Sequence, residues 1–175
     1  MKIRNLEDVL TDELKDIYSL EQQLIKALPK MAKASDGELR NAFENHLVQT
    51  RIHADRVQAI CQQLNINPKG KKCYGIAGIV KEGEEVINAD SNPDSLKAAL
   101  IGAAQRVEHY EIAAYGTART HARQLGFISM VDMLNQTLEE EKATDQMLTR
   151  LAENNVNVKA AMEGTGMAAG SNVQM

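Results

Sequence analysis

The segment LTDELKDIYSLEQQLIKALPKM, residues 10–31, repeats apolar residues at alternating spacings of three and four. On a helix these positions form one stripe: Leu10, Leu14, Ile17, Glu21, Leu24, Leu28 and Met31. Such a stripe is typical of a helix that packs against the core of a bundle. Every member is apolar except Glu21, so the segment predicts a core-facing helix with one acid near its middle.

The rest of the chain is also rich in residues that favour helices. Its 175 residues include many alanines, leucines, glutamates and lysines, but only three prolines and no tryptophan. These abundant side chains lose little rotamer freedom in a helix. Turn and cap signals divide the chain into four long predicted helices, at about residues 6–34, 38–64, 93–124 and 127–153.

Two cap signals support these boundaries. Ser35 and Glu38 have the spacing of a capping box, which predicts the start of the second helix. Asn92, Pro93 and Asp94 provide a cap, a first-turn proline and a first-turn acid for the third helix. Both signals lie where the apolar periodicity is interrupted.

The connections between the predicted helices differ in length. Two are short and give two antiparallel hairpins, whereas residues 66–92 form a long crossover that we expect to contain a short helix within Ile76–Ile87. A bundle with one long crossover is the ferritin-like arrangement. We therefore predict an all-α, ferritin-like four-helix bundle over residues 3–155. The small and polar residues 156–175 predict a flexible C-terminal tail.

The core-facing stripes of all four helices are interrupted by polar residues near mid-helix. Counting residues from the turns places six of them at one level of the bundle: Glu21, His53, Glu108, Glu111, Glu141 and Asp145. Each buried carboxylate without a partner costs several kcal/mol, and a divalent cation would supply the missing positive charge. Carboxylates with an imidazole suit iron or manganese. We therefore predict that these six residues bind iron or manganese, as one ion or as a pair.

Several of these polar residues have an alternative interpretation. The acids could instead pair with Arg or Lys, and Glu139 and Glu140 are expected to be solvated. His46 and Thr50 also lie on the stripe, but a histidine at the core edge, bonded to a carbonyl, is the favoured interpretation of His46. Tyr18 and Tyr115 each lie one turn from a stripe acid; we expect packing between helices, with a hydrogen bond to a ligand carboxylate as the alternative.

Four segments carry a resemblance to a known family: residues 12–21, 27–31, 108–111 and 138–145. Over about residues 3–155 the chain resembles the YciE/YciF family of bacterial stress-associated proteins. This resemblance implies a ferritin-like fold and a homodimer. Ferritin-like proteins commonly use a Glu on two helices and Glu-x-x-His on the other two.

The ferritin-like pattern carries over to this sequence only in part. Glu21 and His53 match it, and Glu108 and Glu111 are spaced as in rubrerythrin-like proteins. Thr50 replaces an expected Glu, and Asp145 stands where rubrerythrin-like proteins have a His. The resemblance therefore implies a site rich in oxygen ligands and poor in nitrogen.

Two functions follow from the sequence. The first is a dinuclear metal protein that acts on oxygen or peroxide as a small oxidant substrate. The second is a non-catalytic, dimeric helical scaffold with a degenerate or empty metal site. The net charge of −4 argues against nucleic acid and anionic membranes as partners. No signal peptide or transmembrane run is visible and the two cysteines form no CxxC pattern, so a cytoplasmic location is expected.

Overall fold

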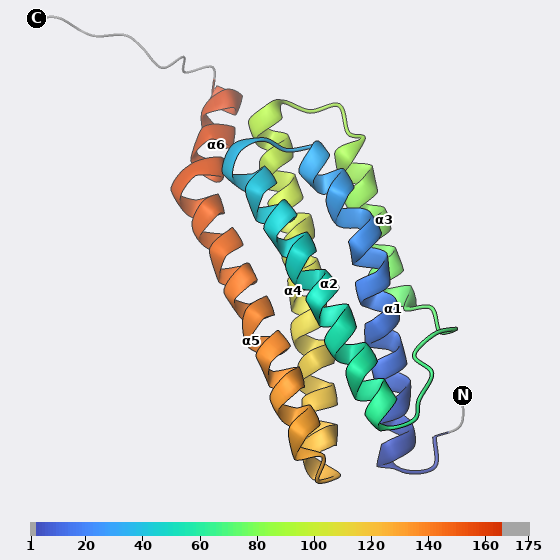
Figure 1. Ribbon diagram of the computed structural model, residues 1–175. Coiled ribbons are helices and arrows are strands. Elements are labelled where there is room, and N and C mark those ends of the chain that lie inside the picture. Colours follow the sequence, from blue (N-terminus) through green and yellow to red (C-terminus); the bar gives the residue numbers. More distant parts are fainter. Residues whose placement is uncertain (1–2, 166–175) are drawn as a thin grey trace, which may run out of the picture.

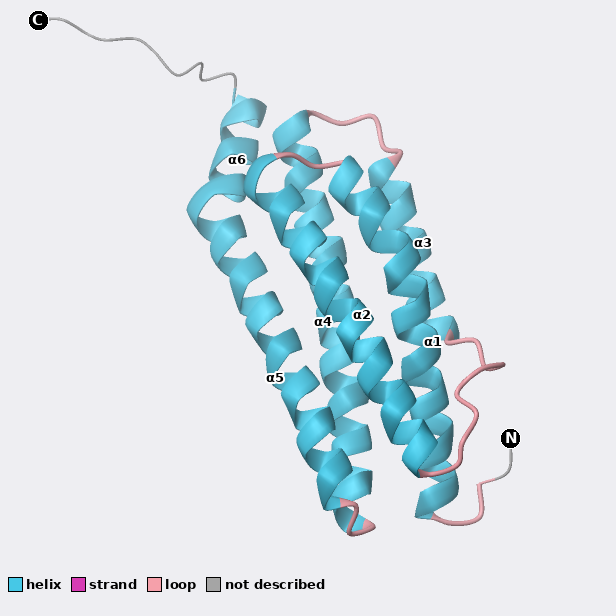
Figure 2. Cartoon of the chain, viewed as in Figure 1, coloured by secondary structure: helices cyan, strands magenta, loops and turns pink. Residues whose placement is uncertain are grey.

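Four long helices lie side by side along one axis (Figure 1). They are α1 (Leu6–Lys33), α2 (Gly37–Gln63), α4 (Pro93–Gln124) and α5 (Ile128–Leu151). The computed structural model describes residues 3–165, and within that range it contains helices but no strand (Figure 2). The hairpins α1–α2 and α4–α5 pack on each other, which confirms the predicted all-α four-helix bundle.

A short helix, α3 (Tyr74–Ile87), lies in the long crossover, as predicted. It packs along α1 and α4 and returns the chain to the opposite end of the bundle, so that α2 and α4 run in the same direction (Figure 1). The start of α3 is fixed on α1 by two hydrogen bonds. The backbone N–H of Cys73 donates to Ser19 Oγ at 2.9 Å, and Gln23 Nε2 donates to the carbonyl of Cys73 at 3.0 Å.

The turn between α1 and α2 differs from the expected capping box. The Ser35 hydroxyl lies within hydrogen-bond distance of the carbonyls of Met31, at 3.0 Å, and Ala32, at 3.2 Å. It therefore closes the end of α1 instead of capping α2. Asp36 is the residue before α2, and Gly37 begins that helix with a φ of +54°, a conformation that glycine adopts without a steric penalty.

The chain beyond α5 is helical for longer than the sequence predicted. A π-helical turn (Ala152–Val156) leads into α6 (Asn157–Thr165). Ala152 and Val156 are buried in the core, and these apolar contacts attach the segment to the bundle. Residues 166–175, the rest of the predicted tail, lie outside the described residues.

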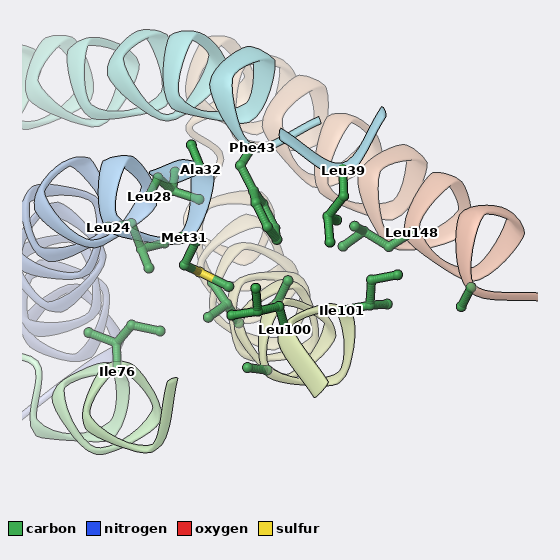
Figure 3. Packing of buried hydrophobic residues seen from close by; sticks show 14 of the residues in the cluster. Leu24, Leu28, Met31, Ala32, Leu39, Phe43, Ile76, Leu100, Ile101 and Leu148 are labelled. Atoms are coloured by element: carbon green, nitrogen blue, oxygen red, sulfur yellow. The ribbon is translucent and has the colours of Figure 1, made fainter. Parts of the chain in front are cut away.

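The apolar core has two halves, one toward each end of the bundle. One half includes Leu24, Phe43, Leu100 and Leu148 (Figure 3). The other half includes Leu14, Val57, Ala118 and Leu134. Buried polar side chains from all four long helices lie between the two halves. None of the helices among residues 3–165 is long and apolar enough to span a membrane.

Candidate metal centre

Six ionisable side chains meet between the two halves of the core, and each is at most 3% exposed. They come from α1, α2, α4 and α5: Glu21, His46, His53, Glu108, Glu111 and Glu141. Residues three or seven positions apart share one face of a helix. The two histidines of α2 and the two glutamates of α4 therefore point into the same layer.

The first cluster contains His46, Glu108, Glu111 and Glu141. One donor atom of each lies within 4.8 Å of a donor atom of every other. His46 Nε2 is 3.3 Å from Glu108 Oε1 and 3.9 Å from Glu111 Oε2. Neither ring nitrogen of His46 makes an aligned hydrogen bond with any of residues 3–165. One imidazole nitrogen and several carboxylate oxygens thus face a common space.

The second cluster contains Glu21, His53 and Glu141. His53 Nδ1 lies 2.7 Å from Glu141 Oε1, although Nδ1 makes no aligned hydrogen bond. Tyr115 donates a short hydrogen bond to Glu21 Oε1, which leaves Glu21 Oε2 without a partner. Tyr115 therefore bonds a predicted ligand from across the bundle, and it also packs in the apolar core between the helices, as expected.

Glu141 belongs to both clusters, so its carboxylate would be shared if each cluster held an ion. Neighbouring ligand atoms of an octahedral ion with bonds of about 2.1 Å lie about 3 Å apart. The donor separations of 2.7 Å at His53 and 3.3 Å at His46 are close to that spacing. The layer thus has the composition of two adjoining metal sites.

Burial controls the protonation of the carboxylates. Burial, followed by the charge of Glu141, raises the pKa of Glu21 to about 8. The same two causes raise the pKa of Glu108 and of Glu111 well above the usual range of a glutamate. Because the charged forms are disfavoured, the metal-free layer takes up protons that a cation would displace.

The two histidines differ in their electrostatic surroundings. Burial lowers the pKa of His46 and favours the neutral imidazole, which is the form that binds metals. Burial acts in the same direction on His53, but the nearby carboxylates of Glu141, Glu21 and Glu140 outweigh it, so the pKa of His53 is raised. A cation at the second cluster would offset the negative charge that raises this pKa.

A hydrogen-bond network holds His53 from the side away from the cluster. His53 Nε2 lies 2.8 Å from Glu140 Oε2, and Arg56 donates to both oxygens of Glu140 and to Thr137 Oγ1. With its proton on Nε2, His53 presents the Nδ1 lone pair to Glu21 and Glu141. The prediction that Glu140 is simply solvated is therefore wrong.

Five of the six predicted ligands are brought together, and Asp145 is not among them. Asp145 Oδ1 accepts a hydrogen bond from Gln105 Nε2 at 3.1 Å and lies 3.4 Å from His109 Nε2. These contacts hold the partly exposed Asp145 at the rim of the α4–α5 contact. Asp145 lies in neither cluster.

His46 provides the second nitrogen that the sequence interpretation lacked. It precedes His53 by seven residues on the same stripe of α2, and this spacing was the signal that could have identified it. Thr50 lies between them, but its hydroxyl donates to the carbonyl of His46 at 2.8 Å and adds no charge to the site. Each cluster therefore contains one imidazole, and both imidazoles come from α2.

The residues present fit a bound cation. All six side chains of the layer have buried polar atoms without a hydrogen-bond partner. No Lys or Arg among residues 3–165 forms an ion pair with Glu21, Glu108, Glu111 or Glu141. The expected alternative of arginine or lysine pairs is therefore wrong for these four acids. Carboxylates with one imidazole per cluster suit iron or manganese.

A four-helix bundle with one long crossover is the ferritin-like fold, and this chain has it. A solved structure described as ferritin-like, diiron-carboxylate proteins from Bacillus anthracis str. Ames shares this fold. Its TM-score is 0.66 at 18% identity, with 85% of this chain and 99% of that chain covered. Within the class, this chain belongs to the family described as "Domain of unknown function (DUF892)", whose profile matches residues 5–161.

Two relatives show how similar the family members are. Protein YciF of Escherichia coli K12 is 47% identical over 162 residues, which cover 91% of this chain and 98% of YciF. The crystal structure of YciF, described as a stress protein, superposes with a TM-score of 0.85 over 89% of this chain and 99% of that chain. YcfI from Rhodopseudomonas palustris, described as a putative structural protein, is 38% identical with a TM-score of 0.81, covering 85% and 95%. The resemblance to the YciE/YciF family is confirmed.

Proposed function

We propose that this protein holds a pair of iron or manganese ions in its central polar layer and acts there on oxygen or peroxide. The observation that supports the proposal is the set of unpartnered buried atoms on six side chains from four helices. Leaving that many polar atoms unsatisfied is strongly destabilising. Two cations would satisfy the oxygens and the imidazole nitrogens together.

Each part of the layer has a separate role in this proposal. His46, Glu108 and Glu111 would hold one ion, Glu21 and His53 the other, and Glu141 would bridge them. Iron or manganese bound there would supply the electrons that oxygen or peroxide takes up. The protein itself supplies a rigid, water-poor environment and fixes the orientation of every ligand.

Three residues outside the clusters fix the ligands at the second position. Burial and the neighbouring Glu21 raise the pKa of Tyr115 well above 10, so its hydroxyl stays protonated and keeps donating to Glu21. Glu140, anchored by Arg56, sets the tautomer of His53. Together they hold the Glu21 carboxylate and the His53 ring in fixed positions.

Thr50 stands where the ferritin-like pattern has a Glu, so the site has one carboxylate ligand fewer than that pattern. Thr50 is fully buried, and its hydroxyl is bonded to the backbone of α2. A Glu at this place would be one of the carboxylate ligands of the ferritin-like pattern. With Thr50 in its stead, we expect that position to be available to oxygen or peroxide.

Metal analysis followed by an oxidant assay tests this function. Protein purified without chelator and reconstituted with Fe(II) should bind about two equivalents per chain and consume oxygen or peroxide. Glu141→Ala should lower the bound metal at both positions, whereas Glu139→Ala, a change at an exposed carboxylate of the same helix, should not. Binding of less than about half an equivalent by the reconstituted wild type would refute the proposal.

The competing account is a non-catalytic scaffold in which the carboxyls share protons. The raised pKa values of Glu108 and Glu111 favour this account for metal-free protein. It predicts that a chelator leaves the melting temperature unchanged. The metal account predicts that a chelator lowers the melting temperature strongly, because a ligand that binds only the native state stabilises that state.

We further propose a homodimer that acts in the cytoplasm during stress. The family resemblance supports the dimer, and the description of the E. coli relative as a stress protein supports the physiological setting. Light scattering should give twice the chain mass of 19.3 kDa. A mass equal to that of one chain would refute the dimer without affecting the metal proposal.

A further inference from the structure

A small apolar cavity lies beneath α3, next to the first cluster of the candidate metal centre. Its volume is about 30 Å³. Ile79, Val80 and Gly83 line it from α3, and the half of the core that contains Leu24, Met31 and Phe43 lines it from the other helices. Figure 3 shows Met31 and Phe43 pointing into the space between the helices. The cavity lies between α3 and the core of the bundle and is partly open to solvent.

The two ends of the cavity differ in chemistry. Its inner end reaches His46 and Glu108, which belong to the first cluster. Its outer end is lined by Lys30 and Glu84, whose side chains form a 2.6 Å ion pair between α1 and α3. The apolar space thus leads from an exposed ion pair to the imidazole of His46 in the first cluster.

Size and lining together select the occupant. A cavity needs about 10–15 Å³ to hold one water molecule, so the volume suits one diatomic molecule. Between its two ends the cavity is lined mainly by hydrocarbon side chains, and an apolar cavity stays dry while it binds apolar gases such as xenon. Hydrogen peroxide would lose its hydrogen bonds to water there without replacement. Dioxygen is uncharged, apolar and diatomic, and it gives up no hydrogen bonds to water when it enters the cavity.

We propose that this cavity binds dioxygen and admits it to the metal centre from the side of His46 and Glu108. The delivery step rests on the proposed function, whereas the binding of an apolar gas does not. Ile76 and Gly83 are the buried residues of α3, and its other apolar side chains, such as Ile79 and Val80, are only partly buried against the core. Small outward movements of α3 would open the path.

Gly83 allows the cavity to be filled by one substitution. A Cβ at this position would meet only the Cβ of Ala103, at an ordinary contact distance of 4.0 Å. Gly83→Leu therefore adds a side chain at the cavity wall without a backbone clash. Gly78→Leu is the matched control, because a Cβ at Gly78 of the same helix has no atom within 4 Å and this residue does not line the cavity. Both changes replace a helical glycine by a better helix former.

Xenon is the probe for gas binding, and methyl-labelled protein without metal is sufficient for the measurement. Under xenon pressure the methyl NMR signals of Leu24, Met31 and Ile79 should shift and saturate. Gly83→Leu should weaken xenon binding by about tenfold or more, since the space is filled, while Gly78→Leu should not. Wild-type protein whose cavity methyls do not respond to xenon would overturn the binding proposal.

A second cavity variant and an oxidant assay complete the test. Ile79→Phe fills the cavity from a partly buried position, so it tests the idea even if Gly83→Leu does not fold. In iron-loaded protein, either cavity variant should slow oxygen consumption about fivefold or more and leave peroxide consumption unchanged. Equal rates of oxygen consumption in wild type and variants would overturn the delivery route. So would a loss of peroxide consumption as large as the loss of oxygen consumption. If iron-loaded wild type consumed no oxygen, the proposed function would fail, and saturable xenon binding would still support the gas site.

Discussion

Metal-free protein should become less stable as the pH rises from about 4.5 to about 8. Glu21 has an ordinary pKa of 4.5, and burial together with Glu141 raises it to about 8 in the folded protein. One pKa unit corresponds to about 1.4 kcal/mol. The shift of Glu21 alone therefore lowers the free energy of unfolding by on the order of 5 kcal/mol across this range.

The free energy of unfolding falls with rising pH because the folded state prefers the protonated carboxyl of Glu21. The stability that Glu21 contributes is complete below pH 4.5 and is lost as the pH rises through 8. Glu108 and Glu111 act in the same direction because their pKa values are also raised, and so does His53, whose raised pKa gives stability that is lost at higher pH. His46 acts in the opposite direction, because its lowered pKa costs stability as the pH falls below 6.5.

Urea unfolding at several pH values, with EDTA or with saturating Mn(II), measures this effect. The chelated protein should lose stability toward about pH 8, and Mn(II) should restore it because a cation stabilises the ionised carboxylates. Glu21→Gln should make stability depend less on pH. The glutamine carbonyl can still accept the hydrogen bond from Tyr115. Glu139→Gln serves as the control on the exposed face. Chelated wild type that is as stable at about pH 8 as at about pH 5 would refute this reasoning.

Three further predictions separate the ligands from their neighbours. His46→Ala should reduce bound metal from about two equivalents to about one, whereas exposed His109→Ala should leave two; equal stoichiometry in both variants would remove His46 from the site. Glu140→Gln should weaken metal binding at the second cluster by about 10- to 100-fold, because it loses the charge that orients His53; unchanged affinity by titration calorimetry would refute that role. Asp145→Asn should bind metal as wild type does, since its carboxylate bonds Gln105 and not the clusters. A lost equivalent in that variant would restore Asp145 as a ligand.

Periodicity made the bundle predictable from the sequence. The 3–4 spacing of apolar residues identified each core-facing stripe, and Asn92-Pro93-Asp94 marked the start of α4, which the structure begins at Pro93. Ser35 was misassigned because a Ser-x-x-Glu pattern does not reveal whether the serine hydroxyl faces the helix before it or the helix after it. The α6 segment was missed because its attachment to the core depends on tertiary contacts of Ala152 and Val156.

The central layer was only partly predictable, for geometric reasons. Stripe position and depth located Glu21, His53, Glu108, Glu111 and Glu141 correctly, because helix length converts directly into height along the bundle. The stripe pattern did not separate Asp145 from the cluster, because its place at the rim depends on tertiary contacts with Gln105 and His109 of α4. The stripe pattern also did not predict that Glu140, which lies on a neighbouring face of α5, contacts His53.

Anomalous diffraction at the iron and manganese edges, on crystals grown from metal-reconstituted protein, tests the central claim most directly. The account predicts two peaks in the polar layer, one beside His46, Glu108 and Glu111 and one beside Glu21 and His53, with Glu141 bound to both ions. An ordered layer without a peak, with its carboxyls bonded to one another or to water, would contradict it.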